Sequence, residues 1–158
     1  MFSRRMIGIE LSGIRKMFDL ADKDSINLGL GEPDFQPPEE AIEAVHSAMK
    51  MGFNKYGPTN GLPELRKAIA LRLRKYWKNI GSENVVVTSS GSEALFSGAM
   101  TFIDTGNTVL LPDPGFVLYK PHVQLTGGKG IAYPLAIEND FRPDIEVMER
   151  LADDNTKV

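Results

Sequence analysis

The chain contains no cysteine, only two histidines, and no hydrophobic run approaching the ~20 residues needed to cross a bilayer. Without cysteine it cannot build disulfides, thiolate zinc sites, iron–sulfur clusters or a thiol nucleophile. His46 and His122 are too few for a histidine-rich metal centre, so we expect no metal site. These absences remove most metal and redox chemistry that the protein would carry on its own side chains.

The chain also lacks an excess of either charge: 18 Lys and Arg stand against 21 Asp and Glu, a formal net charge of -3. Such a balance gives no general attraction to nucleic acid or anionic membrane, and we expect neither as a partner. Two arginines precede an apolar patch near the start, but Glu10 interrupts it too early for a signal peptide. A cytoplasmic location is therefore expected.

What the chain does have is an ordinary globular composition, with 42% hydrophobic residues over 158 positions. Apolar periodicity predicts helices that alternate with short, continuously apolar strands, which is typical of an α/β fold with a mainly parallel sheet covered on both faces. Residues 1–25 are predicted to form an N-terminal arm with short helical segments. The expected helices lie within residues 38–52, 63–78, 92–102, 119–125 and 143–151, and the expected strands within 84–88, 108–111 and 130–135.

The turn Ser90-Gly91-Ser92 connects an expected buried strand to an expected helix. A helix start exposes unpaired N–H groups, and glycine lets an anion approach the backbone, so the turn suits a phosphate monoester. The same residues also fit a plain serine cap followed by Glu93 in the first turn. The turn matches neither the Walker A pattern, nor Gly-x-Gly-x-x-Gly, nor the Gly-x-Ser-x-Gly nucleophile elbow.

Two aromatic residues are further candidates. Tyr56 lies in a loop rich in glycine and proline, which would hold its ring at the surface. Phe116 directly follows Asp113-Pro114-Gly115 after a strand, at the edge where open α/β sheets bind ligands. Each residue alone also has an ordinary explanation: an exposed tyrosine is common, and a phenylalanine at a helix start often plugs the core.

The order of these signals along the chain resembles the fold-type I aminotransferases that use pyridoxal phosphate, in the class I/II group of aspartate and aromatic aminotransferases. Four stretches carry the resemblance, and together they span nearly the whole chain: Ile26–Phe35, Tyr56–Arg66, Val87–Leu95 and Leu111–Phe116. The resemblance implies a three-layer large domain with a mainly parallel sheet, here incomplete. Residues 1–50 would form the N-terminal arm and part of the small domain, and residues 51–158 the start of the cofactor-binding domain.

The resemblance also implies roles for individual residues. Ser90, Gly91 and Ser92 would hold the phosphate of pyridoxal 5′-phosphate, and Phe116 would stack on its ring, where many relatives carry Trp or Tyr. Gly31 would offer a main-chain contact to the carboxylate of an amino acid or 2-oxo acid substrate. Tyr56 would reach the phosphate of a neighbouring subunit, which implies a homodimer with a shared site.

The chain departs from the family pattern most clearly in the residues that it lacks. The family needs a lysine that bonds the cofactor, an acid at the pyridine nitrogen, an asparagine and a substrate-binding arginine, and no lysine here stands in the family's setting after a serine-rich strand end. We therefore expect an N-terminal part of an aminotransferase, inactive alone and without catalytic residues of its own. Another fold-type I enzyme, such as a lyase, and a non-catalytic aminotransferase-like regulatory domain are the alternatives.

Overall fold

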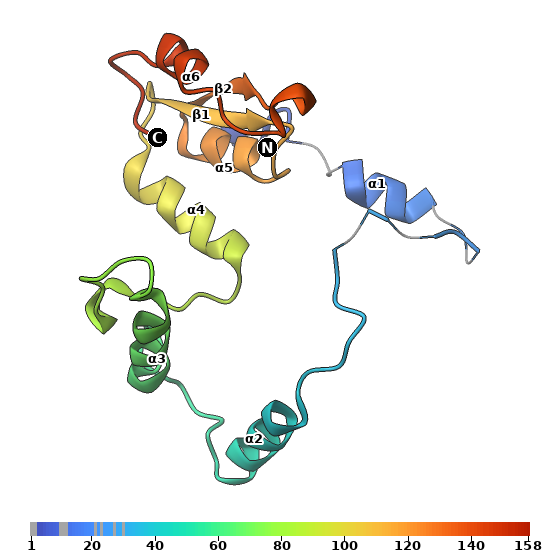
Figure 1. Cartoon of the computed structure of the whole chain (residues 1–158), viewed down its shortest axis with the longest axis vertical. Helices are drawn as coiled ribbons and strands as arrows, with labels where there is room; N and C mark the ends of the chain where they lie inside the picture. Colours follow the sequence, from blue (N-terminus) through green and yellow to red (C-terminus); the bar gives the residue numbers. More distant parts are fainter. Residues whose placement is uncertain (1–2, 10–12, 21, 23, 27, 30) are drawn as a thin grey trace. The chain divides into compact units, whose positions relative to one another are not determined.

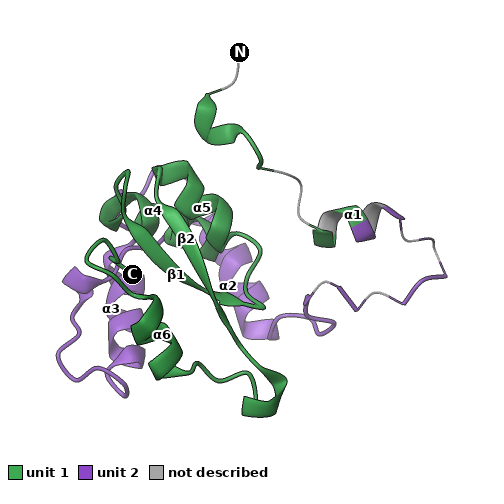
Figure 2. Ribbon diagram, turned by 90° about the horizontal axis from the view of Figure 1, so that it is seen from above, with its two compact units in different colours: residues 1–16, 89–158 green, residues 17–88 purple. Residues whose placement is uncertain are grey.

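The structure, a computed structural model, describes residues 3–9, 13–20, 22, 24–26, 28–29 and 31–158. It divides into two compact units, one of residues 1–16 and 89–158 and the other of residues 17–88 (Figure 2). Asn27 and Leu30, which belong to the first of the four family-like stretches, lie outside the described residues. The domain boundary predicted between residues 50 and 51 stays a prediction.

The first unit contains a parallel pair of strands, β1 (Thr108–Asp113) and β2 (Lys129–Pro134), joined by helix α5 (Tyr119–Thr126). Figure 1 shows α5 on one face of this pair and α6 (Ile145–Leu151) on the other. Helix α4 (Gly91–Phe102) packs beside α5. Parallel strands need a long crossover connection, and α5 provides it. The predicted α/β class with a parallel sheet between helices is thus confirmed.

The core of this unit is small and lies where α4, α5 and β1 meet. Ile103, Val109 and Val123 are its buried members, and Ala99 and Leu111 pack against them. The end of α5 follows the predicted glycine stop, because Gly127 adopts the left-handed conformation (φ 86°) at the helix C-cap. The chain can therefore reverse within two residues and enter β2.

The last residues of the chain lie alongside β1 on the side away from β2. The Thr108 amide donates to the Asn155 carbonyl (2.9 Å), and the Lys157 amide donates to the Thr108 carbonyl (3.0 Å). Thr108 and Thr156 form a parallel bridge. Among the described residues β1 is thus the central strand, with β2 on one side and residues 155–158 on the other.

Strand β2 faces β1 with every second amide. Lys129 donates to the Asn107 carbonyl, and Leu135 donates to the Asp113 carbonyl. Since amides alternate along a strand, Pro134 occupies an outward position, where a missing N–H costs no hydrogen bond.

The N-terminal segment of the first unit lies against α5. The short 3-10 helix η1 (Arg4–Met6) contacts α5, and the Gln124 side-chain amide donates to the carbonyls of Arg5 (3.1 Å) and Ile7 (2.7 Å). A second 3-10 helix, η3 (Ile137–Asn139), follows β2. Asp144 caps α6, with its carboxylate accepting from the Val147 amide.

The second unit consists of helices α2 (Glu39–Lys50) and α3 (Pro63–Leu73) and the 3-10 helix η2 (Ser82–Asn84). Helix α1 (Gly13–Leu20) spans the division between the units. The start of α2 after Pro38 and its end before Gly52 agree with the prediction. Helix α3 ends earlier than predicted and continues as turns to Tyr76.

The strand predicted at residues 84–88 was wrong: these residues form the end of η2 and an irregular segment. Their backbone groups bond elsewhere, since the Arg66 guanidinium donates to the carbonyls of Val85 (2.8 Å) and Ser82 (2.6 Å). The Val87 amide donates to the Asn60 carbonyl (3.1 Å). A strand is defined by its ladder partners, and here a side chain and a loop take their place.

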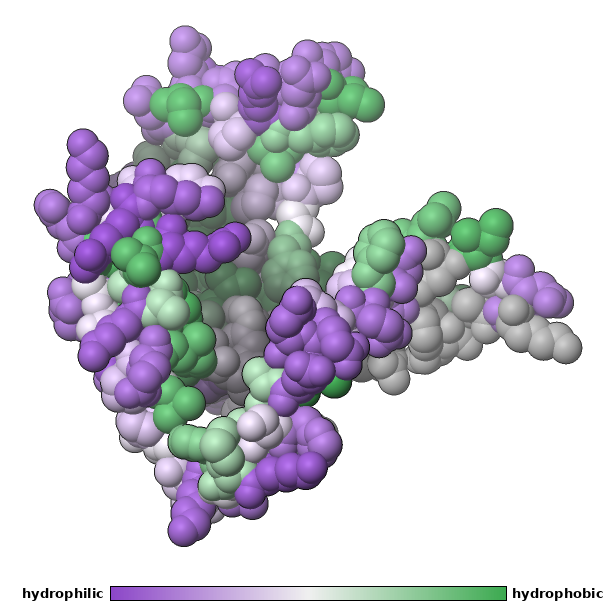
Figure 3. Space-filling view, turned by 60° about the horizontal axis from the view of Figure 1, so that its bottom comes forward, coloured by the Kyte–Doolittle hydropathy of each residue, from purple (hydrophilic) through white to green (hydrophobic). Residues whose placement is uncertain are grey.

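Apolar side chains also lie at the surface, and Figure 3 shows them among hydrophilic ones. The stripe of α2, formed by Ile42, Val45 and Met49, is exposed although its helical spacing is that of a core face. Within the described part of the chain, no helix has the length and apolarity that a membrane span requires.

Candidate functional site

The first residues of α4 present the donors that a bound anion would use. Ser90 is the N-cap, and its hydroxyl accepts from the Glu93 amide (3.2 Å). Gly91 and Ser92 follow as the first two helical residues, for whose amides the helix itself provides no acceptor. These amides carry the partial positive charge of the helix start. The three predicted residues therefore lie together at a helix N-terminus, as expected.

Gly91 is required neither by backbone conformation nor by packing. Its φ lies outside the left-handed region, and an added Cβ would meet nothing within 4 Å. Any small residue would fit here as far as the fold is concerned. A side chain at this position would occupy space that is open in the structure.

Glu93 makes a contact that the sequence reasoning missed. One oxygen of its carboxylate accepts from both the amide and the hydroxyl of Ser89, each at 2.6 Å. The hydrogen bonds from the Ser89 hydroxyl and then from its amide lower the pKa of Glu93 below the ordinary glutamate value. The spacing Ser90-x-x-Glu93 was the available signal, because it is that of a capping box.

Phe116 lies in the loop after β1, two residues beyond a cis peptide bond between Asp113 and Pro114. Phe116 is 47% exposed. Its contact with Tyr119 is edge-to-face, with ring centroids 5.6 Å apart and an interplanar angle of 77°. An edge contact of this kind orients a ring, and the exposed part remains available for stacking on another flat group.

Helix α4 and strand β1 border the same cavity, and Phe116 lies just beyond the carboxyl end of β1. Ala94, near the start of α4, lines one cavity together with Pro112 and Tyr119 from the end of β1 and the start of α5. At the other end of α4, Ile103 packs with Val109 at the beginning of β1. The end of α4 thus lies at the start of β1, and Phe116 follows the carboxyl end of this strand, where α/β folds bind ligands.

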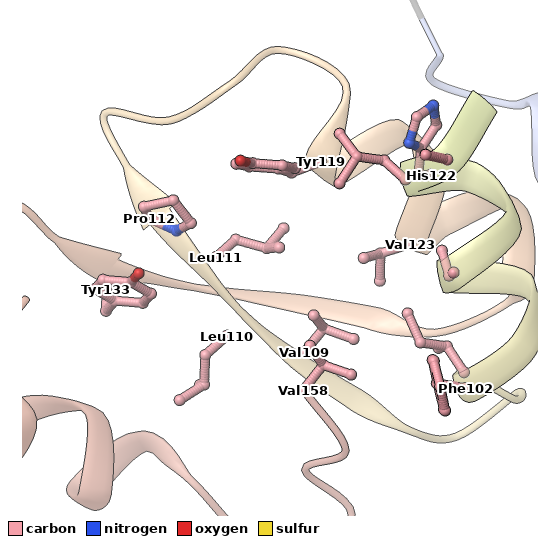
Figure 4. Close-up of a pocket in the computed structure, with 15 residues that line it drawn as sticks. Phe102, Val109, Leu110, Leu111, Pro112, Tyr119, His122, Val123, Tyr133 and Val158 are labelled. Atoms are coloured by element: carbon pink, nitrogen blue, oxygen red, sulfur yellow. The ribbon is translucent and has the colours of Figure 1, made fainter. Parts of the chain in front are cut away.

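That cavity has a volume of about 540 Å³ and is mainly apolar (Figure 4). Tyr119 and Leu111 lie on the same side of β1 in this view, and Leu110 points to the other side. The His122 ring packs edge-to-face on Phe96 (5.5 Å), and its Nδ1 is buried without a hydrogen-bond partner. The described residues that line the cavity include none of the predicted site residues.

Tyr56 and Gly31 belong to the other unit. The Tyr56 side chain is fully exposed, and an added Cβ on Gly31 would meet nothing within 4 Å. The loop that carries Tyr56 is held at its other end, where Gly61 (φ 98°) lies against Val87. The described residues contain no group of three or more His, Asp or Glu placed to hold a metal ion.

Residues 23–158 match the family described as aminotransferase class I and II. The chain belongs to this aminotransferase family. It is 41% identical to an aspartate aminotransferase of Pyrococcus abyssi, over 99% of the chain and 41% of that protein. It is 36% identical to aromatic-amino-acid aminotransferase 2 of Thermococcus litoralis, again over 99% of the chain and 41% of that protein.

Solved structures of the same family share the fold. The aspartate aminotransferase of Thermus thermophilus, solved with maleate, superposes with a TM-score of 0.91 at 33% identity. This superposition covers 99% of the chain and 43% of the Thermus chain. The chain thus spans about two fifths of the length of the aminotransferases it matches.

Proposed function

We propose that this chain forms the phosphate-binding and ring-stacking part of a pyridoxal-phosphate-dependent aminotransferase. That enzyme would move an amino group between an amino acid and a 2-oxo acid. Family membership supports the activity, and the open helix start at Gly91 is the single observation that carries the site. The donors there, backbone amides and serine hydroxyls, are those that bind a phosphate monoester.

The residues present fit the cofactor's two ends. Gly91 and Ser92 would donate their amides to the phosphate, with the hydroxyls of Ser90 and Ser92 beside them. The half-exposed ring of Phe116 would lie against the flat heterocycle. Bound pyridoxal phosphate supplies the electron sink that stabilises negative charge at the substrate α-carbon. The chain's own contribution is to bind and orient that group.

The proposal assigns two further roles in the other unit. Gly31 would donate its amide to the substrate carboxylate, and Tyr56 would reach a phosphate in a second copy of the chain, which makes the protein a homodimer. The complete exposure of the Tyr56 ring fits a role that requires another subunit. The side chain of the substrate is left open, because matched relatives are named for aspartate and for aromatic amino acids over this same stretch.

The test is Gly91→Val in a full-length protein that carries this sequence. A branched side chain would fill the space above the amides, so retention of pyridoxal phosphate through dialysis should fall at least tenfold, as expected when close charge-assisted contacts are lost. Gly98→Val is the matched control, since Gly98 lies in the same helix and its added Cβ also meets nothing within 4 Å. Unchanged cofactor absorbance in the Gly91 variant would refute the placement.

A further inference from the structure

The carboxylate of Glu93 binds the residue just before the anion-binding turn rather than the turn itself. In an ordinary capping box the acid at this position accepts from the amide of the N-cap residue. Here Glu93 accepts from the amide and the hydroxyl of Ser89, one residue earlier, while the Ser90 hydroxyl caps the helix. Two short hydrogen bonds to one charged oxygen fix the backbone path into Ser90.

This arrangement decides which donors remain for an anion. The amides of Ser89 and Glu93 are already engaged. The next amides in the helix, from Ala94 on, bond within it, as Ala94 does with the Ser90 carbonyl (3.1 Å). The amides of Gly91 and Ser92 have no acceptor within the helix. They are therefore the amides that a bound anion would use.

Glu93 has two opposite effects on a phosphate at this site. Its negative charge repels a second anion nearby, which weakens binding. Its hydrogen bonds to Ser89 hold the donors of the turn in one arrangement, which strengthens binding because less ordering remains to be done. The two effects have different signs and can be separated by substitution.

We propose that Glu93 is a positioning residue for the phosphate turn: by holding Ser89, it keeps the amides of Gly91 and Ser92 directed at the cofactor phosphate. This inference rests on the proposed function. The group that the turn would bind is the phosphate monoester of the cofactor, and Glu93 acts through Ser89 without touching that phosphate.

The experiment follows backbone amides of the ¹⁵N-labelled 158-residue chain during titration with inorganic phosphate and with pyridoxine 5′-phosphate. The second probe has no aldehyde and cannot bond to lysines. Three variants are compared with the unchanged chain. Glu93→Gln removes the charge but keeps an acceptor of the same shape, Glu93→Ala removes both, and Glu146→Ala removes one exposed charge from the first turn of α6 as a control.

We expect Glu93→Ala to bind both probes roughly three- to tenfold more weakly, about the effect of one hydrogen bond, with the Ser89 amide shifted before any probe is added. Glu93→Gln should bind at least as tightly as the unchanged chain, because the repulsion is gone and one acceptor remains. Glu146→Ala should change the affinity by less than twofold. Far-UV circular dichroism checks that α4 persists in each variant.

Tighter binding in both Glu93 variants would overturn the inference, since it would show that Glu93 acts only as a nearby charge. Equal affinity of Glu93→Ala and the unchanged chain would overturn it as well. In both cases the proposed function stands, because the amides of Gly91 and Ser92 still respond. If these amides fail to respond to either probe in the unchanged chain, the phosphate site itself is wrong and the inference falls with it.

Discussion

Glycine serves two different purposes in the first unit. At Gly91 the space that a side chain would occupy is empty, so glycine here leaves the start of α4 open. Gly128 is the opposite case, because an added Cβ would come within 2.6 Å of Ile103 Cγ2 and 3.3 Å of Val123 Cγ1. Both contacts are with members of the buried core. The same residue type thus leaves space open in one place and permits close packing in the other.

This difference predicts opposite effects on stability. Gly128→Ala should lower the free energy of unfolding by about 1–3 kcal/mol, because the core must shift to accommodate the methyl group. Gly98→Ala should be neutral or stabilising by up to about 1 kcal/mol, because alanine is the better helix former and the space is open. Urea unfolding followed by circular dichroism measures both. Equal midpoints for the two variants would contradict the packing argument.

At the scale of elements, one carboxylate adds to the backbone hydrogen bonds that hold the segment 153–158 beside β1. The Asp153 carboxylate accepts from the hydroxyls of Thr156 (2.9 Å) and Thr108 (3.1 Å) and from the Asn155 amide (3.0 Å). The hydrogen bond from Thr156 is the main cause that lowers the pKa of Asp153, with those from Thr108 and Asn155 adding to it. The ionised form is therefore the one that holds this segment.

A lowered pKa in the folded state means that the stabilisation is present above the ordinary Asp value of 3.8 and is lost as the pH falls through the folded value below it. We expect the Lys157 amide, which bonds to the Thr108 carbonyl, to lose protection in that acid range. Asp153→Asn should show the loss already at neutral pH. NMR of the Lys157 amide between neutral pH and the acid range measures both, and a pH-independent signal that the Asn variant shares would exclude this role of Asp153.

The elements show what local sequence can predict. Local signals placed several helix ends correctly: Pro38 before α2, the serine cap of α4, the glycine after α5 and the Asp144 cap of α6. Residues 84–88 have an equally clear apolar, β-branched pattern, yet they form no strand. A helix satisfies its backbone from within, whereas a strand needs a neighbour that its own sequence does not specify.

The same limit applies to the candidate site. Ser90, Gly91 and Ser92 could be placed at the start of α4 because the cap and the first helical residues are consecutive in the sequence. The contact of Glu93 with Ser89 was missed because the usual rule directs such an acid to the N-cap residue. The partners of Tyr56 and Gly31 could not be predicted from the local sequence, because they depend on elements distant in the sequence, and only the family resemblance suggested them.

For the whole molecule, the question is whether this stretch holds a cofactor covalently. Its lysines lie in varied settings, and only Lys50 follows a serine by three residues, in the last turn of α2 rather than after a strand. We expect that borohydride reduction of the 158-residue chain with pyridoxal phosphate labels several lysines at comparable levels. Peptide mass spectrometry locates the labels. A single lysine carrying nearly all of the label, and losing it on substitution by arginine, would contradict this expectation.

The proline at the outer side of β2 has a consequence for how copies of the chain behave together. An uncovered strand edge invites pairing with the same edge of another molecule, which is the first step toward fibres and precipitates. Pro134 lacks the amide that such a pairing would use, and Lys129 places a charge at the start of the strand. The outer edge of β2 is therefore a poor template for strand pairing between molecules.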